Sequence, residues 1–138
     1  MRTIGSSKGG SCAIYYGLCI GADAVYAGAC QYYVGNYLYT DKHMQIFKAM
    51  MGEHVDHIDR DKLNKILPCK IEQCKNSSTT INLLYSPNEH TYPEHIVYLI
   101  NDLKKANIKY NEKIEKFEDH LEVGRYFVPY IREELKDL

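Results

Sequence analysis

The sequence lacks an excess of charge of either sign, a long apolar run and a regular cysteine pattern. Lys and Arg number 17 against 18 Asp and Glu, so bulk electrostatics favours no polyanionic partner, and a nucleic acid would have to bind a local patch. No run approaches the ~18 to 20 apolar residues of a membrane span. We therefore expect no membrane association.

The cysteines also exclude one class of protein. They are odd in number and irregularly spaced, and they come without a convincing export signal, which favours free thiols in the cytoplasm over a disulfide framework. The five are Cys12, Cys19, Cys30, Cys69 and Cys74. No internal repeat or low-complexity linker appears, and 138 residues that are 45% hydrophobic suit a single domain over residues 1–138.

The N-terminal third predicts a sheet. Tyr, Val, Ile and Cys occur in short runs broken by glycines, a pattern typical of strands and turns. We expect strands near 12–19, 23–31 and 32–39, antiparallel because the gaps are too short for a crossover helix. Residues 5–10 are expected to be a turn. A phosphate-binding loop there would need a helix directly after it, where a strand is predicted.

The remaining chain predicts alternating helices and strands. Helices are expected after Thr40-Asp41 as far as Gly52, after Asp59 or Asp61 as far as Pro68, and over 93–106, 111–122 and 125–138. Strands are expected over 54–58, 79–85 and 108–110, and residues 69–78 are expected to be irregular. The predicted fold class is therefore α+β: antiparallel N-terminal strands, alternating helices and strands, and a helical C-terminal half.

Potential metal ligands and proton-transfer groups gather in residues 53–64, which hold two histidines and three aspartates. The run Val55-Asp56-His57-Ile58-Asp59, followed by Leu63-Asn64, resembles the central motif of the HNH (ββα-metal) nucleases of phage and mobile elements. The resemblance implies that Asp56 ligates Mg²⁺ or Mn²⁺ and that His57 is the general base. It implies a supporting role for His43, although Met44 stands where the family often has Arg.

The downstream part of that motif is not matched. Residues 67–70 read Leu-Pro-Cys-Lys where the family has Asn-Leu-Arg, and Asn76 is the nearest match to the last metal ligand. The chain could therefore be a degenerate relative. A separate interpretation places structural zinc between His54, His57, Cys69 and Cys74, which supply four plausible ligands within twenty-one residues.

Two weaker resemblances also point to nucleases. Ile14-Tyr15 and Tyr26-Ala27-Gly28 have the spacing of the GIY-YIG motif, but Asn36 stands where that family needs Arg. The predicted order of strands and helices resembles an RNase H-like fold, although its opening strand carries no carboxylate.

The tyrosines support a non-enzymatic alternative. Thirteen occur in the chain, and those between Tyr15 and Tyr39 would alternate along the predicted strands, so one sheet face would carry exposed rings. Such a face suits a protein partner, an inhibited target or a homo-oligomer. The sequence thus leaves two functions: a metal-dependent or degenerate nuclease, and a protein-binding module.

Overall fold

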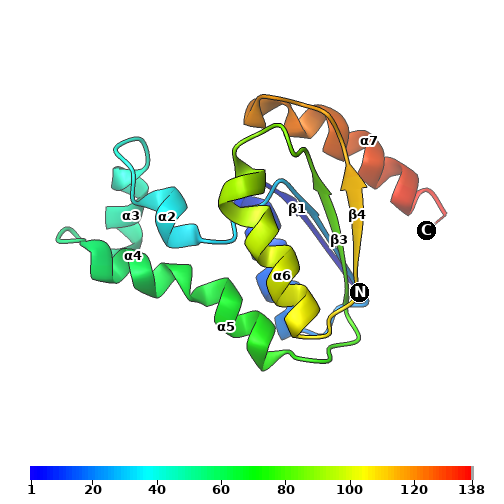
Figure 1. The fold of residues 1–138 in the computed structure, drawn as a ribbon, viewed down its shortest axis with the longest axis horizontal. Coiled ribbons are helices and arrows are strands. Elements are labelled where there is room, and N and C mark those ends of the chain that lie inside the picture. Colours follow the sequence, from blue (N-terminus) through cyan, green and yellow to red (C-terminus); the bar gives the residue numbers. More distant parts are fainter. Residues whose placement is uncertain (138) are drawn as a thin grey trace.

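The protein is built on a four-stranded, wholly parallel β-sheet. The computed structural model describes residues 1–137, and Figure 1 shows its helices arranged around the sheet. The strands are β1 (Arg2–Ser6), β2 (Ala24–Gly28), β3 (Thr80–Tyr85) and β4 (Tyr110–Ile114). They are adjacent in the order β1-β2-β3-β4, and each neighbouring pair is parallel. The predicted antiparallel N-terminal sheet is therefore wrong.

Helices occupy every connection between these strands, and two more follow β4. They are α1 (Lys8–Cys19), α2 (Val34–Leu38), α3 (Met44–Met51), α4 (His57–Asn64), α5 (Ile66–Gln73), the π-helix η1 (Tyr92–Ile96), α6 (Val97–Lys105), the 3-10 helix η2 (His120–Glu122) and α7 (Val123–Leu135). Parallel strands need such crossovers, because each chain reversal must return to the same end of the sheet.

The first helix replaces the strand predicted at 12–19. Its buried residues include Ala13, Ile14, Gly17 and Leu18, which recur at helical spacing and make one face. A Cβ at Gly17 would lie 2.4 Å from Cγ2 of Val25, so glycine lets α1 pack closely on β2. Tertiary packing here outweighs the local preference of tyrosine and cysteine for strands.

The sheet is covered on both faces. Val25 and Ala27 of β2 and Ile81 and Leu83 of β3 belong to one core together with side chains from α1, α5 and α6. Leu84 faces the other way, into a second core that α7 covers. This alternation follows the period of two of a strand. The helices α2, α3 and α4 gather at one side of the sheet (Figure 1) and have a small core of their own.

The other predicted elements are partly confirmed. Helix α3 lies within the helix predicted from Thr40-Asp41 to Gly52. Strand β3, the helical segments η1 and α6, and helix α7 lie close to the elements predicted over 79–85, 93–106 and 125–138, although Leu138 lies outside the described residues. Strand β2 lies within 23–31. The predictions of a strand over 32–39 and a helix over 111–122 are wrong, since α2 and β4 lie there.

The segment singled out as a possible metal site is the start of a helix. Asp56 is the N-cap of α4, and its Oδ1 accepts hydrogen bonds from the N–H groups of Ile58 (2.9 Å) and Asp59 (3.1 Å). The Asp59 side chain accepts from the Asp56 N–H in return, which completes a capping box. The strand predicted at 54–58 is therefore wrong. Pro68, expected to end a helix, lies within the first turn of α5, where proline is tolerated.

Candidate active site

Polar side chains follow the carboxyl ends of all four strands. Ser7 comes directly after β1, Gln31 lies just beyond β2, Glu89 follows β3, and His120 begins η2 after β4. Because the carboxyl ends of parallel strands meet at one edge of the sheet, residues up to 113 positions apart come together there. This edge is where open α/β sheets bind their ligands.

Ser7 lies on a sharp turn between β1 and α1 with an unusual backbone conformation. Its φ is 52° and its ψ is −128°, a combination that costs a non-glycine residue about 1–3 kcal/mol. The Ser7 N–H donates to the Gly28 carbonyl at 2.7 Å. A Cβ at Gly5 would lie 2.1 Å from the Gly9 oxygen, so glycine at position 5 lets the strand and the helix cross closely. The turn thereby presents the Ser7 hydroxyl at the sheet edge.

His120 contacts the Ser7 hydroxyl. The distance from Ser7 Oγ to His120 Nε2 is 2.8 Å, and the imidazole is mostly buried. On the other side of the ring, Nδ1 lies 3.4 Å from Oε2 of Glu89. This contact lacks the geometry of a hydrogen bond, and within residues 1–137 the buried Nδ1 has no other hydrogen-bond partner. If Nδ1 carries the proton toward Glu89, Nε2 is left with a lone pair that can accept the Ser7 proton.

Glu89 is a buried carboxylate, 3% exposed. Burial raises its pKa, but the interaction with His120 and the hydrogen bonds from the Thr91 side chain and N–H outweigh this, and the pKa lies below the ordinary value. The Thr91 hydroxyl donates to Oε1, and the Thr91 N–H donates to Oε2 at 3.1 Å. Glu89 is therefore ionised at neutral pH, and it can orient His120 and stabilise the imidazolium.

Two further donors surround the Ser7 hydroxyl. Gln31 is 1% exposed, and its Nε2 donates to Ser7 Oγ at 3.1 Å. Its carbonyl accepts the Ser11 hydroxyl at 2.5 Å, which fixes the Gln31 backbone against α1. In the described part of the chain the Lys8 N–H makes no hydrogen bond. It is the first N–H of α1, so it has no intrahelical acceptor.

The site opens into a cavity of about 1040 Å³. Ser7 and His120 lie in its wall with residues of α2, η1 and η2 and of the segment around His43. A smaller hollow of about 370 Å³ adjoins it, and Asn36, Glu94 and His95 line both. The cavity has room for an acyl group and a second, polar molecule.

His95 is a buried histidine that is neutral at pH 7. Burial lowers its pKa to about 4, and the charges of His90 and His120 act in the same direction, while Glu94 and Glu89 oppose them. The Tyr33 N–H donates to Nδ1 at 3.1 Å, so the ring proton of the neutral form is on Nε2.

This histidine predicts a loss of stability in acid. Between pH 6.5, near the pKa of an unfolded histidine, and pH 4, only the unfolded state binds the proton, so the free energy of unfolding falls as the pH falls. The loss reaches about 3 kcal/mol at most. Urea unfolding at pH 7 and at pH 4.5 measures it, and His95→Gln is expected to show a smaller decrease. An equal decrease in both proteins would contradict the assignment.

The structure does not bring the residues of the predicted nuclease site together with the cavity. Asp56 uses its carboxylate to cap α4, while His57 and His54 are exposed. Asn76 has a φ of 61° and accepts a hydrogen bond from Asn107 at 2.9 Å. Of the residues proposed from that motif, only His43 lies in the cavity wall.

The four predicted zinc ligands are also not gathered. Within residues 1–137, Glu89, His90 and His120 are the group whose ligand atoms lie within 4.8 Å of one another. Neither the His54 and His57 pair nor the Cys69 and Cys74 pair belongs to it. All five cysteines are free thiols.

The tyrosine-rich sheet face is not formed as predicted. Tyr15 and Tyr16 lie on α1, Tyr37 lies on α2, and among the tyrosines from Tyr15 to Tyr39 only Tyr26 lies in a strand. A protein partner or a homo-oligomer stays a prediction. None of the described helices is both long and apolar enough to cross a bilayer.

The most informative signal in the sequence is Gly5-Ser6-Ser7-Lys8-Gly9. It has the form Gly-x-Ser-x-Gly, in which a serine sits on a strained strand-to-helix turn. The prediction of a plain turn at 5–10 missed it, because α1 was taken for a strand. Glu89 and His120 carry no comparable local signal, but their order after the serine, acid then histidine, is that of α/β-hydrolases.

The fold and the site together resemble those of a known class of proteins. A parallel sheet with helices on both faces, a serine on a strained turn, and an acid and a histidine after later strands are similar to the arrangement in α/β-hydrolase-like proteins. Chemically, this arrangement suits covalent acyl transfer through the serine.

Comparison with known proteins agrees on the fold. No family model matches the sequence, and no curated protein matches it. Among solved structures, the capsule O-acetyltransferase of Neisseria meningitidis serogroup A is similar with a TM-score of 0.80 and 22% identity, over 96% of this chain and 54% of that protein. Fluorophosphonate-binding serine hydrolase F of Staphylococcus aureus is similar with a TM-score of 0.68 and 15% identity, over 98% and 52%.

A third similar structure is the Glycosylation Associate Protein (Gap123) complex of Streptococcus agalactiae. Its TM-score is 0.71 at 21% identity, over 97% of this chain and 28% of that one. The chain thus spans about half the length of the first two structures, and less of the third. Identities this low establish the fold alone.

These similarities overturn the nuclease interpretation. The similar structures include an O-acetyltransferase and a serine hydrolase, and the HNH-like segment is the cap of a helix. The resemblances to GIY-YIG and RNase H-like nucleases are wrong for the same reason. The predicted Mg²⁺, Mn²⁺ or Zn²⁺ cofactor belonged to those readings, and Ser–His acyl transfer does not require one.

Proposed function

We propose that the protein transfers acyl groups through a covalent acyl-serine formed on Ser7. The observation that carries this proposal is the 2.8 Å contact between Ser7 Oγ and His120 Nε2 on a strained turn, with the buried Glu89 carboxylate 3.4 Å behind the imidazole. The fold similarity to an O-acetyltransferase and a serine hydrolase supports the same reaction class. A histidine-to-alanine mutant of that acetyltransferase is described in complex with CoA, so an ester or a thioester is a reasonable acyl donor.

In the acylation step, Ser7 Oγ attacks the carbonyl carbon of the donor and His120 Nε2 takes the hydroxyl proton. The bond from Oγ to the acyl carbon forms, the bond to the alcohol or thiol leaving group breaks, and the leaving group receives the proton from His120. Glu89 stabilises the imidazolium that exists between these two transfers. Deacylation repeats the sequence with an acceptor hydroxyl in place of Ser7.

The negative charge that develops on the carbonyl oxygen needs N–H donors. The Lys8 N–H supplies one, since the residue after the nucleophile donates in such turns and the positive end of the α1 dipole adds to it. The side chain of Gln31 donates to Ser7 Oγ itself. It therefore fixes the hydroxyl rotamer and stabilises the negative charge that Oγ carries as it leaves in deacylation.

A fluorophosphonate probe tests this function directly, because it phosphonylates an activated serine irreversibly. We expect labelling of Ser7, located by mass spectrometry of the tryptic peptide, and no labelling of Ser7→Ala. Ser6→Ala is the matched control, because Ser6 is the neighbouring hydroxyl on β1 and lacks the histidine. A wild-type protein that is not labelled, or equal labelling of Ser7→Ala, would refute the proposal.

A further inference from the structure

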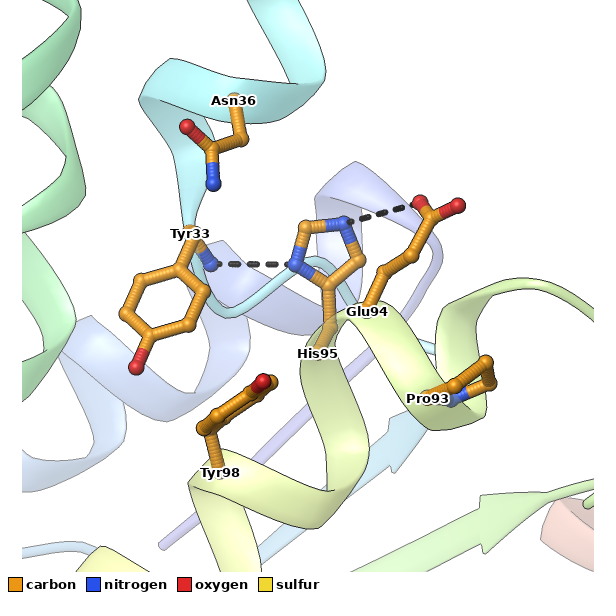
Figure 2. A pocket seen from close by; sticks show the side chains of 6 residues that line it. All are labelled: Tyr33, Asn36, Pro93, Glu94, His95 and Tyr98. Atoms are coloured by element: carbon orange, nitrogen blue, oxygen red, sulfur yellow. Dashed lines mark hydrogen bonds and ion pairs between the residues drawn. The ribbon is translucent and has the colours of Figure 1, made fainter.

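A second pocket adjoins the serine site. Tyr33, Asn36, Pro93, Glu94, His95 and Tyr98 line this hollow of about 370 Å³, and Figure 2 shows their side chains around it. Asn36, Glu94 and His95 also line the larger cavity that holds Ser7 and His120. The smaller hollow therefore adjoins the cavity of Ser7, and these three residues belong to both.

The Asn36 amide is held in one orientation. Its backbone N–H donates to Asn64 Oδ1 at 2.8 Å, which identifies the Asn64 oxygen. The Asn64 Nδ2 must then be the donor to Asn36 Oδ1, also at 2.8 Å. The Asn36 Nδ2 is left without a partner among residues 1–137, and Figure 2 shows it facing the space between Tyr33 and His95. Asn64, from the segment first considered for a metal, thus fixes a free donor in this pocket.

His95 supplies a second donor. Its side chain is 2% exposed, and because Nδ1 accepts from Tyr33 the neutral ring carries its proton on Nε2. Oε2 of Glu94 lies 4.0 Å from Nε2, which is too far for a hydrogen bond. In the described part of the chain Nε2 makes no hydrogen bond, and it is not one of the fully enclosed unpaired atoms, so its N–H is open to a ligand in the hollow.

The other walls limit the ligand's chemistry. The rings of Tyr33 and Tyr98 lie 5.2 Å apart at 55°, and Pro93 adds apolar surface. Glu94 brings a carboxylate that accepts hydrogen bonds and repels anions, and no Lys or Arg lines the hollow. The pocket therefore suits a neutral molecule that has several groups able both to accept and to donate hydrogen bonds, and an apolar face that can pack on the tyrosine rings.

We propose that this pocket, which we call the acceptor subsite (Tyr33, Asn36, Pro93, Glu94, His95 and Tyr98), binds an uncharged sugar or polyol whose hydroxyl takes the acyl group from Ser7. The inference rests on the proposed function. The ligand's hydroxyls accept from Asn36 and His95 and donate to Glu94, and its C–H face lies on the tyrosine rings. In the transfer, His120 takes the proton of the attacking hydroxyl, the new ester bond forms, the bond from Ser7 Oγ to the acyl carbon breaks, and Oγ recovers the proton.

An acceptor assay tests the subsite. With p-nitrophenyl acetate as donor, neutral methyl glycosides and glycerol are compared with glucose 6-phosphate, and acetylated acceptor is measured by mass spectrometry beside nitrophenolate release. We expect saturable acetylation of a neutral acceptor and little of the phosphate. Asn36→Asp keeps the shape and removes the donor, and should raise the acceptor KM about tenfold. Gln45→Ala, an exposed amide on α3, is the control and should match wild type.

A second variant makes the test independent of a loss of activity. Glu94→Gln removes the anion, so it should increase acetylation of glucose 6-phosphate relative to the neutral glycoside. Fluorophosphonate labelling of Ser7 separates the two proposals. A wild-type protein that labels at Ser7 but acetylates no sugar or polyol, or an Asn36→Asp variant equal to Gln45→Ala, overturns the acceptor subsite alone. Absence of labelling overturns the proposed function itself.

Discussion

Replacing His120 with alanine is expected to lower kcat/KM for p-nitrophenyl acetate on the order of 10⁴-fold. His120 Nε2 is the one base in contact with Ser7 Oγ in the described part of the chain, so its loss leaves the hydroxyl proton without an acceptor during attack. The residual rate would come from the Lys8 N–H and from Gln31, which remain. Steady-state kinetics with the burst of nitrophenolate resolved measures both acylation and turnover.

His90→Ala is the matched control for that experiment. The His90 ring lies 5.3 Å from that of His120 and its nitrogens pair with Glu89 and Glu94, but it does not contact Ser7. We expect it to change kcat/KM by no more than a few fold. A His120→Ala protein with wild-type kinetics, or two variants with equal losses, would show that the histidine beside Ser7 is not the base.

Gly5→Ala is expected to destabilise the protein by about 3 kcal/mol or more. The added Cβ would lie 2.1 Å from the carbonyl oxygen and 2.4 Å from the carbonyl carbon of Gly9. These are backbone atoms, so no side chain can rotate to make room, and β1 or α1 must shift. Thermal unfolding followed by circular dichroism measures the loss as a fall in Tm, and Ser7 labelling should fall with it.

Gly9→Ala provides the comparison at the other end of the same turn. A Cβ at Gly9 would meet nothing within 4 Å, and Gly9 lies inside α1, where alanine is preferred to glycine by about 0.5–1 kcal/mol. Its Tm should be unchanged or slightly higher. If Gly5→Ala unfolded at the same temperature as Gly9→Ala, the close crossing of β1 and α1 would not be what requires glycine at position 5.

The sequence predicted best those elements whose signals are local. Met44, Phe47 and Met51 repeat at helical spacing before Gly52, and α3 ends at Met51. The apolar run Thr80–Tyr85 is a strand, as predicted. The strand predicted over 12–19 was wrong because Tyr, Cys and Ile favour strands locally. The helix forms there because it buries Ala13, Ile14 and Leu18 against the sheet. The helix predicted over 111–122 was wrong because Tyr110–Ile114 pairs with β3 at the sheet edge. The charged sequence of this segment gives no local signal for a strand.

The sequence showed correctly that residues 53–64 are polar, but their interpretation as a metal site was wrong. Asp56 and His57 are exposed and Asp59 is half-buried, and a helix cap is the ordinary structure for Asp-x-x-Asp before a helix. A ten-residue resemblance cannot distinguish a cap from a metal site, because the difference lies in what other segments bring nearby. In the structure, Asn36 lies next to this segment and exchanges two hydrogen bonds with Asn64.

The sequence by itself determined the pieces of the serine site: Gly5 and Ser7 in a Gly-x-Ser-x-Gly run, with an acid and a histidine later in the chain. Only the tertiary structure decided which of the six histidines and eighteen carboxylates complete it. The physical reason is the parallel sheet. Its crossovers bring the carboxyl ends of β1, β3 and β4 to one edge, so Ser7 meets His120 across 113 positions, a contact that no local pattern encodes.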